Sequence, residues 1–69
     1  MTMIPVSSSN IASVGYSQEN EILTVEFIRG EQYEYYDVPE YIYRELMSAS
    51  SHGSYFNMNI RNAFSYNKV

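Results

Sequence analysis

The chain has 69 residues, no cysteine and a formal net charge of −4. A chain this short buries only about 60% of the surface that it exposes when unfolded, so it holds one modest core and leaves no room for a second domain. The lack of cysteine excludes disulfides, and a single histidine offers too few ligands for a structural metal. We therefore expect residues 1–69 to form one domain without metals or cofactors.

Composition also restricts the location and the partners of the chain. The apolar fraction is 45%, but no apolar run approaches the roughly 18 residues of a membrane span. Neither a secretory signal nor a lipidation motif is visible, so we expect a soluble, cytoplasmic protein that does not bind membranes. Eight acidic residues against four basic ones oppose long-range attraction of nucleic acid, so any such binding has to be local.

The N-terminal part is typical of short strands separated by turns. Residues 3–6 suggest an edge strand or arm, and residues 7–10 a loop, because Ser and Asn side chains bond to their own backbone. Residues 11–16 have the period of a strand, and residues 17–20 break it as a turn. The alternating apolar residues of this strand are Ala12, Val14 and Tyr16.

Residues 22–28 are the clearest strand, and a hairpin follows them. Apolar and polar residues alternate here as in a half-buried antiparallel sheet. Only an odd loop length keeps every large apolar residue of the hairpin on one face, so we predict a three-residue loop, 29–31, that contains Gly30. The expected opposite pairs are Tyr33 with Phe27 and Tyr35 with Val25. An even loop would instead place both tyrosines on the solvent face, where they could bind a ligand.

The C-terminal half indicates two helices. Asp37 and Glu40 have capping-box spacing at the start of the first helix, and Pro39 is tolerated in a first turn. Its predicted buried stripe is Val38, Ile42, Leu46 and Ala49, widened by Tyr43 and Met47. A second helix is predicted at about 54–63, with Phe56, Ile60 and Phe64 on one ridge. Residues 65–69 are expected to add a short extended piece.

These elements predict an α+β fold, namely an antiparallel β-meander of three to four strands covered on one face by two C-terminal helices. Their order and spacing resemble the KTSC domain, a module of about this length found alone in small bacterial and phage proteins and at the C-terminus of some lysyl-tRNA synthetases. The resemblance covers nearly the whole chain. Its segments are Val6-Ser7-Ser8-Ser9-Asn10-Ile11, Val14-Gly15-Tyr16, Leu23-x-Val25-x-Phe27, Tyr33-x-Tyr35, Val38-Pro39 and Gly53-x-Tyr55-Phe56-Asn57-x-x-Ile60-Arg61. The resemblance implies a compact domain of unknown function, with RNA binding suggested by its occurrence in the synthetases.

The first candidate site is a set of tyrosines. Tyr33 and Tyr35 could stack on nucleobases, as aromatic residues on small sheets do in several RNA-binding folds. Packing in the core is the alternative, because an odd hairpin loop can bury both rings. Tyr36 points to the opposite face in a regular strand, so we expect at least one of the three tyrosines near solvent.

The second candidate site is a polar group around the second helix. Arg61 follows Asn57 by about one turn, and Ser54 lies near the start of the helix, where backbone N–H groups are free. Hydroxyls, backbone donors and one guanidinium together suit a phosphate or a carboxylate. Alternatively, Ser51 or Ser54 caps the helix and Arg61 pairs with an acidic residue. The loop 7–10 could also hold an anion, although turn chemistry explains its composition.

No residues suggest catalysis. His52 has no nucleophile or further metal ligand near it in the sequence, and the acidic residues are scattered singly. Gly-rich phosphate loops and nucleophile elbows do not occur. We therefore expect a non-catalytic module that binds single-stranded nucleic acid such as RNA, or a nucleotide-like molecule. The alternative is a module for protein interaction or homo-oligomeric assembly, including a phage-type inhibitor of a host protein or signal; an enzyme is the third choice.

Overall fold

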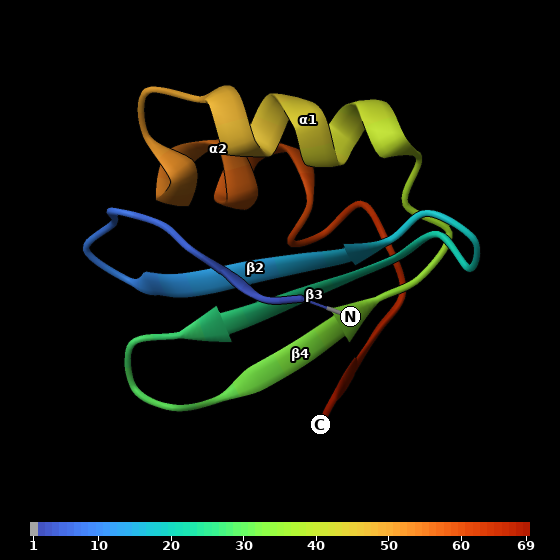
Figure 1. Ribbon diagram of the computed structural model, residues 1–69, viewed down its shortest axis with the longest axis horizontal. Helices are drawn as coiled ribbons and strands as arrows, with labels where there is room; N and C mark the ends of the chain where they lie inside the picture. The colour runs from blue at the N-terminus through green and yellow to red at the C-terminus, as the bar shows by residue number, and fades with distance from the viewer. Residues whose placement is uncertain (1) are drawn as a thin grey trace.

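Five strands and two helices make up residues 2–69, the part of the chain that the computed structural model describes. The strands form one antiparallel sheet in the order β1-β2-β3-β4-β5, and both helices lie over the same face of it (Figure 1). The predicted α+β class is therefore confirmed. The elements are β1 (Ile4–Pro5), β2 (Ile11–Ser17), β3 (Ile22–Phe27), β4 (Gln32–Tyr35), α1 (Glu40–Ser48), α2 (His52–Asn59) and β5 (Tyr66–Lys68).

The predicted number of three to four strands is wrong, because each end of the chain adds a short edge strand. β1 pairs with β2, and β5 returns after both helices to pair with β4. The N–H of Tyr36 donates to the carbonyl of Ser65 at 2.9 Å, and the N–H of Val69 donates to the carbonyl of Gln32 at 2.8 Å. The expected edge strand or arm at residues 3–6 and the expected extended piece at 65–69 are confirmed as β1 and β5. The strand count was too low because two or three residues are too few to show the alternation of a strand.

A bulge in β2 changes which of its residues face the core. Ile11 pairs with Phe27 whereas Ser13 pairs with Glu26, so Ala12 is the extra residue. Ile11 is fully buried, and Ala12 is only partly buried. The predicted alternation is therefore wrong at Ala12, because the bulge turns Ile11 into the core in its place.

The β3–β4 hairpin has a loop of the predicted odd length, displaced by one residue. Gly30 N–H donates to the Phe27 carbonyl, and Phe27 N–H donates to the Glu31 carbonyl, both at 2.8 Å. The three-residue loop is therefore 28–30 and not 29–31. Gly30 has a φ of 99°, in agreement with the left-handed last residue of such loops.

The displaced loop changes the predicted strand register but not the predicted face. Tyr33 lies opposite Val25 and Tyr35 opposite Leu23. The predicted pairs, Tyr33 with Phe27 and Tyr35 with Val25, are wrong by two residues. A shift of two leaves side chains on the same face of a strand, so both tyrosines still share the face of the buried apolar residues.

The first helix begins without the predicted capping box of Asp37 and Glu40. Pro39 is the N-cap residue, and no side chain accepts a hydrogen bond there. Asp37 has a φ of 58°, and this left-handed turn directs the chain from the sheet to the helix. The next N–H, that of Val38, donates to the carbonyl of Glu21 at 2.9 Å, and Val38 is fully buried.

The second helix occupies residues 52–59, whereas 54–63 was predicted. The N–H groups of Ile60 and Arg61 both donate to the Phe56 carbonyl at 3.0 Å, which ends the regular helical hydrogen bonding. Phe64 therefore lies outside the helix and not on a common ridge with Phe56 and Ile60. The turn after Asn59 leads the chain back to the sheet as β5.

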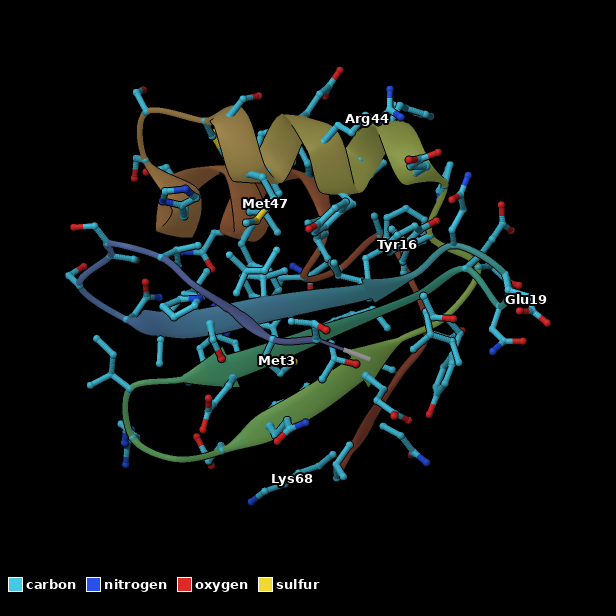
Figure 2. All side chains as sticks on the ribbon, in the orientation of Figure 1. Met3, Tyr16, Glu19, Arg44, Met47 and Lys68 are labelled. Carbon is cyan, nitrogen blue, oxygen red and sulfur yellow. The ribbon has the colours of Figure 1, made fainter. Side chains whose placement is uncertain are left out.

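The core lies between the sheet and the two helices. In Figure 2, Met47 points from α1 towards the sheet, and Tyr16 lies between β2 and α1. The Tyr16 ring stacks on that of Tyr43 at a centroid distance of 5.0 Å, and its hydroxyl donates to the Val38 carbonyl at 2.6 Å. Within residues 2–69, neither helix is long and apolar enough to cross a membrane. The buried apolar residues are Ile11, Val14, Leu23, Val25, Tyr35, Val38, Ile42, Leu46, Phe56 and Ile60.

Five aromatic rings complete the core on the side of β4 and β5, and we call them the aromatic cluster. Phe56 of α2 packs edge to face against Phe27 at 5.5 Å and against Tyr35 at 5.4 Å. Tyr66 of β5 lies 5.5 Å from Tyr35 and 5.7 Å from Tyr33. Edge-to-face pairs contribute about 0.5–1.5 kcal/mol each beyond the area that they bury. The cluster therefore joins α2, the hairpin and β5.

Alkaline pH is expected to weaken this cluster through Tyr35. Burial raises the pKa of Tyr35 to about 12, Tyr66 and Tyr33 add to the rise, and Arg61 opposes it. An unfolded tyrosine ionises near pH 10, so the folded state holds this proton more tightly. The free energy of unfolding that Tyr35 contributes in this way is fully present below pH 10. It is lost between pH 10 and 12 and amounts to roughly 2 kcal/mol.

Denaturant unfolding at pH 9 and pH 11.5 measures this loss. We expect Tyr35→Phe to lose less free energy of unfolding between the two pH values than the unmodified chain. Tyr41→Phe is the matched control, because Tyr41 is 60% exposed and lies outside the cluster. An equal loss in all three proteins would contradict the assignment.

Candidate binding cleft

A cleft of about 540 Å³ opens beside the aromatic cluster. All five rings of the cluster contribute to its wall. Figure 1 shows that α2, the β3–β4 turn and the loop between β1 and β2 lie at the same end of the molecule. The remaining lining residues, which come from these segments and the turn after α2, are Ser9, Asn10, Ile28, Arg29, Glu31, Asn57, Arg61 and Asn62.

Each side of the cleft has a local structural cause. The β-turn at Gly30 brings Arg29 and Glu31 to one end of the hairpin. The end of α2 sets Arg61 beside the fully buried Ile60, so that Ile60 enters the core while Arg61 remains exposed. Pairing between β4 and β5 adds Tyr66 to the same face as Tyr35.

The charge around the cleft differs from that of the whole chain. Two of the four basic residues, Arg29 and Arg61, line it, whereas Glu31 is the one acidic residue in the described lining. Lys68 contacts Glu31 with an Nζ to Oε2 distance of 3.5 Å. Three of the four basic residues are therefore at or next to the cleft of a chain whose net charge is −4.

The remaining basic residue, Arg44, lies elsewhere. Figure 2 shows it on the side of α1 that faces away from the sheet. Its guanidinium pairs with Glu40 at 3.0 Å, one turn earlier in the helix. The ion pairs found within residues 2–69 are this one and Lys68 with Glu31, so the predicted alternative of an acidic partner for Arg61 is not observed there.

The hydrogen bonds of their hydroxyl groups distinguish the structural tyrosines from the tyrosines of the cleft. Tyr16 donates to the Val38 carbonyl, Tyr36 donates to Glu34 at 3.1 Å, and Tyr55 donates to Glu45 at 2.6 Å. Within residues 2–69, the side-chain hydrogen bonds include none from the hydroxyls of Tyr33, Tyr35 or Tyr66. The hydroxyls of the partly exposed Tyr33 and the exposed Tyr66 are therefore available to a ligand, whereas Tyr35 is buried.

The three structural tyrosines all have a raised pKa. Burial raises the pKa of Tyr55 to about 12, with the hydrogen bond to Glu45 as the next cause. Burial likewise raises the pKa of Tyr36, assisted by Glu34, and that of Tyr16, assisted by Glu21 and Glu40. All three hydroxyls therefore keep their protons at neutral pH and act as hydrogen-bond donors.

Four of the six predicted site residues meet in this cleft. It is lined by Tyr33, Tyr35, Asn57 and Arg61. The sequence left open whether the two tyrosines lie in the core or at the surface, and they differ in this respect. Tyr35 is only 4% exposed, whereas Tyr33 is partly exposed and packs against the core. The sequence predicts Arg61 within the second helix, but Arg61 lies just after α2.

The other two predicted residues lie outside the cleft. Tyr36 bonds to Glu34, which alternates with Tyr33 and Tyr35 along β4 and therefore lies on the opposite face. Ser54 lines a smaller hollow of about 370 Å³, formed with the loop 7–10. The Ser54 N–H donates to the Ser51 hydroxyl at 3.2 Å, which confirms the predicted serine cap. Asn57 lines both hollows.

Sequence reasoning missed Arg29, Asn62 and Tyr66. Arg29 was assigned to the hairpin loop with no further role, and Asn62 to the second helix. Tyr66 and Lys68 are two residues apart, as Tyr33 and Tyr35 are, and this spacing could have suggested a strand paired with β4. The signal is weak because it comprises only three residues.

Physically, the cleft combines flat rings with cationic and amide groups. The rings offer faces on which a planar group can stack, and the guanidinium groups of Arg29 and Arg61 suit an anion. Asn57 and Asn62 can donate and accept hydrogen bonds in the same space. The arrangement suits a ligand that has one planar ring and one negative group.

Comparison with known proteins identifies the family of this fold. The KTSC domain model matches residues 7–64. A crystal structure of a KTSC domain protein from Yersinia pestis has a TM-score of 0.94 and 39% identity, covering 99% of this chain and 96% of that one. A protein from Tsukamurella paurometabola is 40% identical over 55 residues, which are 80% of this chain and 82% of that protein.

A longer relative contains the same domain as a small part. The lysine–tRNA ligase of Nostoc punctiforme is 33% identical over 67 residues, which are 97% of this chain but only 12% of the ligase. The activity in the name of that protein is therefore not carried over to this chain. The match of the family model over most of the chain, together with the similarity in fold and in sequence, confirms the predicted resemblance: the chain belongs to the KTSC domain family.

Proposed function

We propose that this KTSC domain is a non-catalytic binding module whose cleft takes a nucleotide, either within single-stranded RNA or as a nucleotide-like small molecule. The observation that carries the proposal is the gathering of three of the four basic residues around a cleft walled by five aromatic rings, on a chain of net charge −4. This combination is local, as binding by an acidic protein requires. The relationship to proteins named as lysine–tRNA ligases adds support for RNA as the source.

The base is held by the aromatic cluster. Tyr66 is 55% exposed and packs against Tyr33 and Tyr35, so its ring is fixed on one side and open on the other. Stacking of one base on an aromatic side chain contributes about 1–3 kcal/mol. Rings already ordered by the core lose little conformational entropy on binding, which favours affinity.

The phosphate is held by Arg61, together with Arg29, which lines the same cleft. Hydrogen bonds from a guanidinium to a phosphate are charge-assisted and stronger than those between neutral groups. Glu31 opposes this less than a free carboxylate would, because Lys68 lies 3.5 Å from it. Asn57 and Asn62 supply amide groups for the edge of the base.

Replacement of Arg61 tests the proposal. We expect Arg61→Ala to weaken the binding of a short single-stranded RNA and of a nucleoside monophosphate by about tenfold or more, because it removes hydrogen bonds to a charged group. Isothermal titration calorimetry measures the dissociation constants. The melting temperature should change little, since Arg61 is exposed and forms no ion pair with the described residues.

Arg44→Ala is the matched control. It removes the same charge from the side of α1 that faces away from the sheet, where the guanidinium pairs with Glu40. Arg44→Ala should therefore retain the affinity of the unmodified protein. Equal losses from both variants would indicate a response to net charge alone and would overturn the cleft as the binding site.

A second function, protein interaction or self-assembly, is supported by the two open edges of the sheet. β1 and β5 form these edges, and all the residues of both strands are exposed. An open edge can add a strand from another chain. Inhibition of a host protein or signal by a phage protein would be one form of this function.

Size-exclusion chromatography with light scattering distinguishes the two functions. The nucleotide-binding proposal expects a monomer at every protein concentration, with a mass that rises on addition of a bound RNA. A stable dimer whose mass does not change when RNA is added would favour assembly instead.

A further inference from the structure

We infer that the cleft holds a single nucleotide carrying a terminal phosphate, and that it does not track a continuous strand. This inference rests on the proposed function, because it specifies the ligand of the same cleft. The ligand class is a nucleoside monophosphate, either free or as the phosphorylated end of an RNA. The structural basis is the confinement of both the stacking surface and the positive charge to one small space.

The size of the cleft corresponds to one small ligand. Its volume is about 540 Å³. Pockets for small organic molecules measure about 300–1,000 Å³, so the cleft lies in the lower half of that range. Surfaces that bind a strand without sequence preference instead use a long basic groove with several successive stacking positions.

The aromatic rings form one group and not a row. The paired rings of the aromatic cluster have centroid distances between 5.4 and 6.5 Å, so the rings stack on and against one another. Tyr16 and Tyr43 stack on each other elsewhere, and Tyr36 lies on the other face with its hydroxyl bound to Glu34. A second base that left the cleft would therefore meet no prepared stacking position among these rings.

The charge distribution leads to the same conclusion. Beyond the cleft and Lys68, the basic residue that remains is Arg44, which is paired with Glu40 on α1. Seven of the eight acidic residues lie outside the cleft lining. A strand that continued over the surface would bring its phosphates towards these carboxylates, which would weaken binding.

Two arginines at the cleft favour a terminal phosphate over an internal one. A phosphate monoester carries about −1.5 to −2 charges at pH 7, whereas an internal diester carries one. Arg29 and Arg61 can neutralise two charges, because the one carboxylate of the described lining, Glu31, is already beside Lys68. The cleft therefore attracts a terminal phosphate more strongly than a phosphate within a strand.

Calorimetric titration with a graded series of ligands tests the inference. The series comprises adenosine, adenosine 5′-monophosphate, and adenylate oligonucleotides of two, four and eight residues, each with and without a 5′-phosphate. We expect the phosphorylated forms to bind at least about tenfold more tightly than their unphosphorylated counterparts. We also expect no gain in affinity per molecule from the mononucleotide to the octanucleotide.

The source of the nucleotide follows from the same titrations. Equal binding of the phosphorylated octanucleotide and the mononucleotide supports an RNA end as the ligand, whereas exclusion of the octanucleotide supports a free nucleotide. Arg29→Ala should weaken the phosphorylated forms by about fivefold and leave adenosine unchanged. Arg44→Ala again serves as the control and should behave as the unmodified chain.

Two results would overturn the inference in distinguishable ways. An affinity that rises more than tenfold with length, without a preference for the terminal phosphate, would show a surface that tracks a strand. That result would leave the proposed function intact. Failure of every member of the series to bind at millimolar concentration would overturn the inference and the proposed function together.

Discussion

The packing of Phe56, a residue of α2, against the sheet is the interaction on which the rest of the structure depends. The core lies between a five-stranded sheet and two short helices of nine and eight residues. Phe56 closes the core on the side of β4 and β5 by contacting Phe27 and Tyr35 edge to face. Tyr33 and Tyr66 extend this packing past the helix. The rings that seal the core are therefore also the wall of the cleft.

This double use of aromatic residues explains why the tyrosines fall into two groups. Tyr16, Tyr36 and Tyr55 bind backbone or carboxylate oxygens and so hold elements together. Tyr33, Tyr35 and Tyr66 contribute packing through their rings, and their hydroxyls bind no described residue. Most of the buried core is aliphatic, and the aromatic side chains both close its open side and form the wall of the cleft.

The basic residues follow the same division. Arg44 forms a helical ion pair of the kind that contributes only a few tenths of a kcal/mol. Arg29 and Arg61 lie at two segment ends, the hairpin turn and the end of α2, where exposed side chains surround the cleft. Electrostatic attraction is thus concentrated at one place, although the molecule as a whole repels anions.

Much of this architecture follows from local patterns, and the failures have physical causes. The α+β class, the odd hairpin loop, the shared face of Tyr33 and Tyr35, and the serine cap of α2 were all predictable, because alternation, parity and capping act over a few residues. The bulge at Ala12 and the left-handed turn at Asp37 were not, because pairing and packing with distant segments determine them.

The cleft was predictable only in part for the same reason. Arg61, Asn57, Tyr33 and Tyr35 were singled out individually, but nothing in the sequence indicated that the helix end and the hairpin face each other across one space. Tyr66 depends on the pairing of a three-residue strand with β4. A segment that short becomes a strand only because the turn after α2 delivers it to an open edge.

The central claim is that the exposed side of the aromatic cluster is the binding surface. Chemical-shift mapping by NMR, during a titration with adenosine 5′-monophosphate, tests it most directly. The account predicts that the amide signals of Tyr33, Arg61 and Tyr66 move together, while those of Tyr36 and Arg44 stay in place. Shifts centred on the opposite face of the sheet, around Glu34 and Tyr36, or an unchanged spectrum at millimolar nucleotide, would contradict the claim.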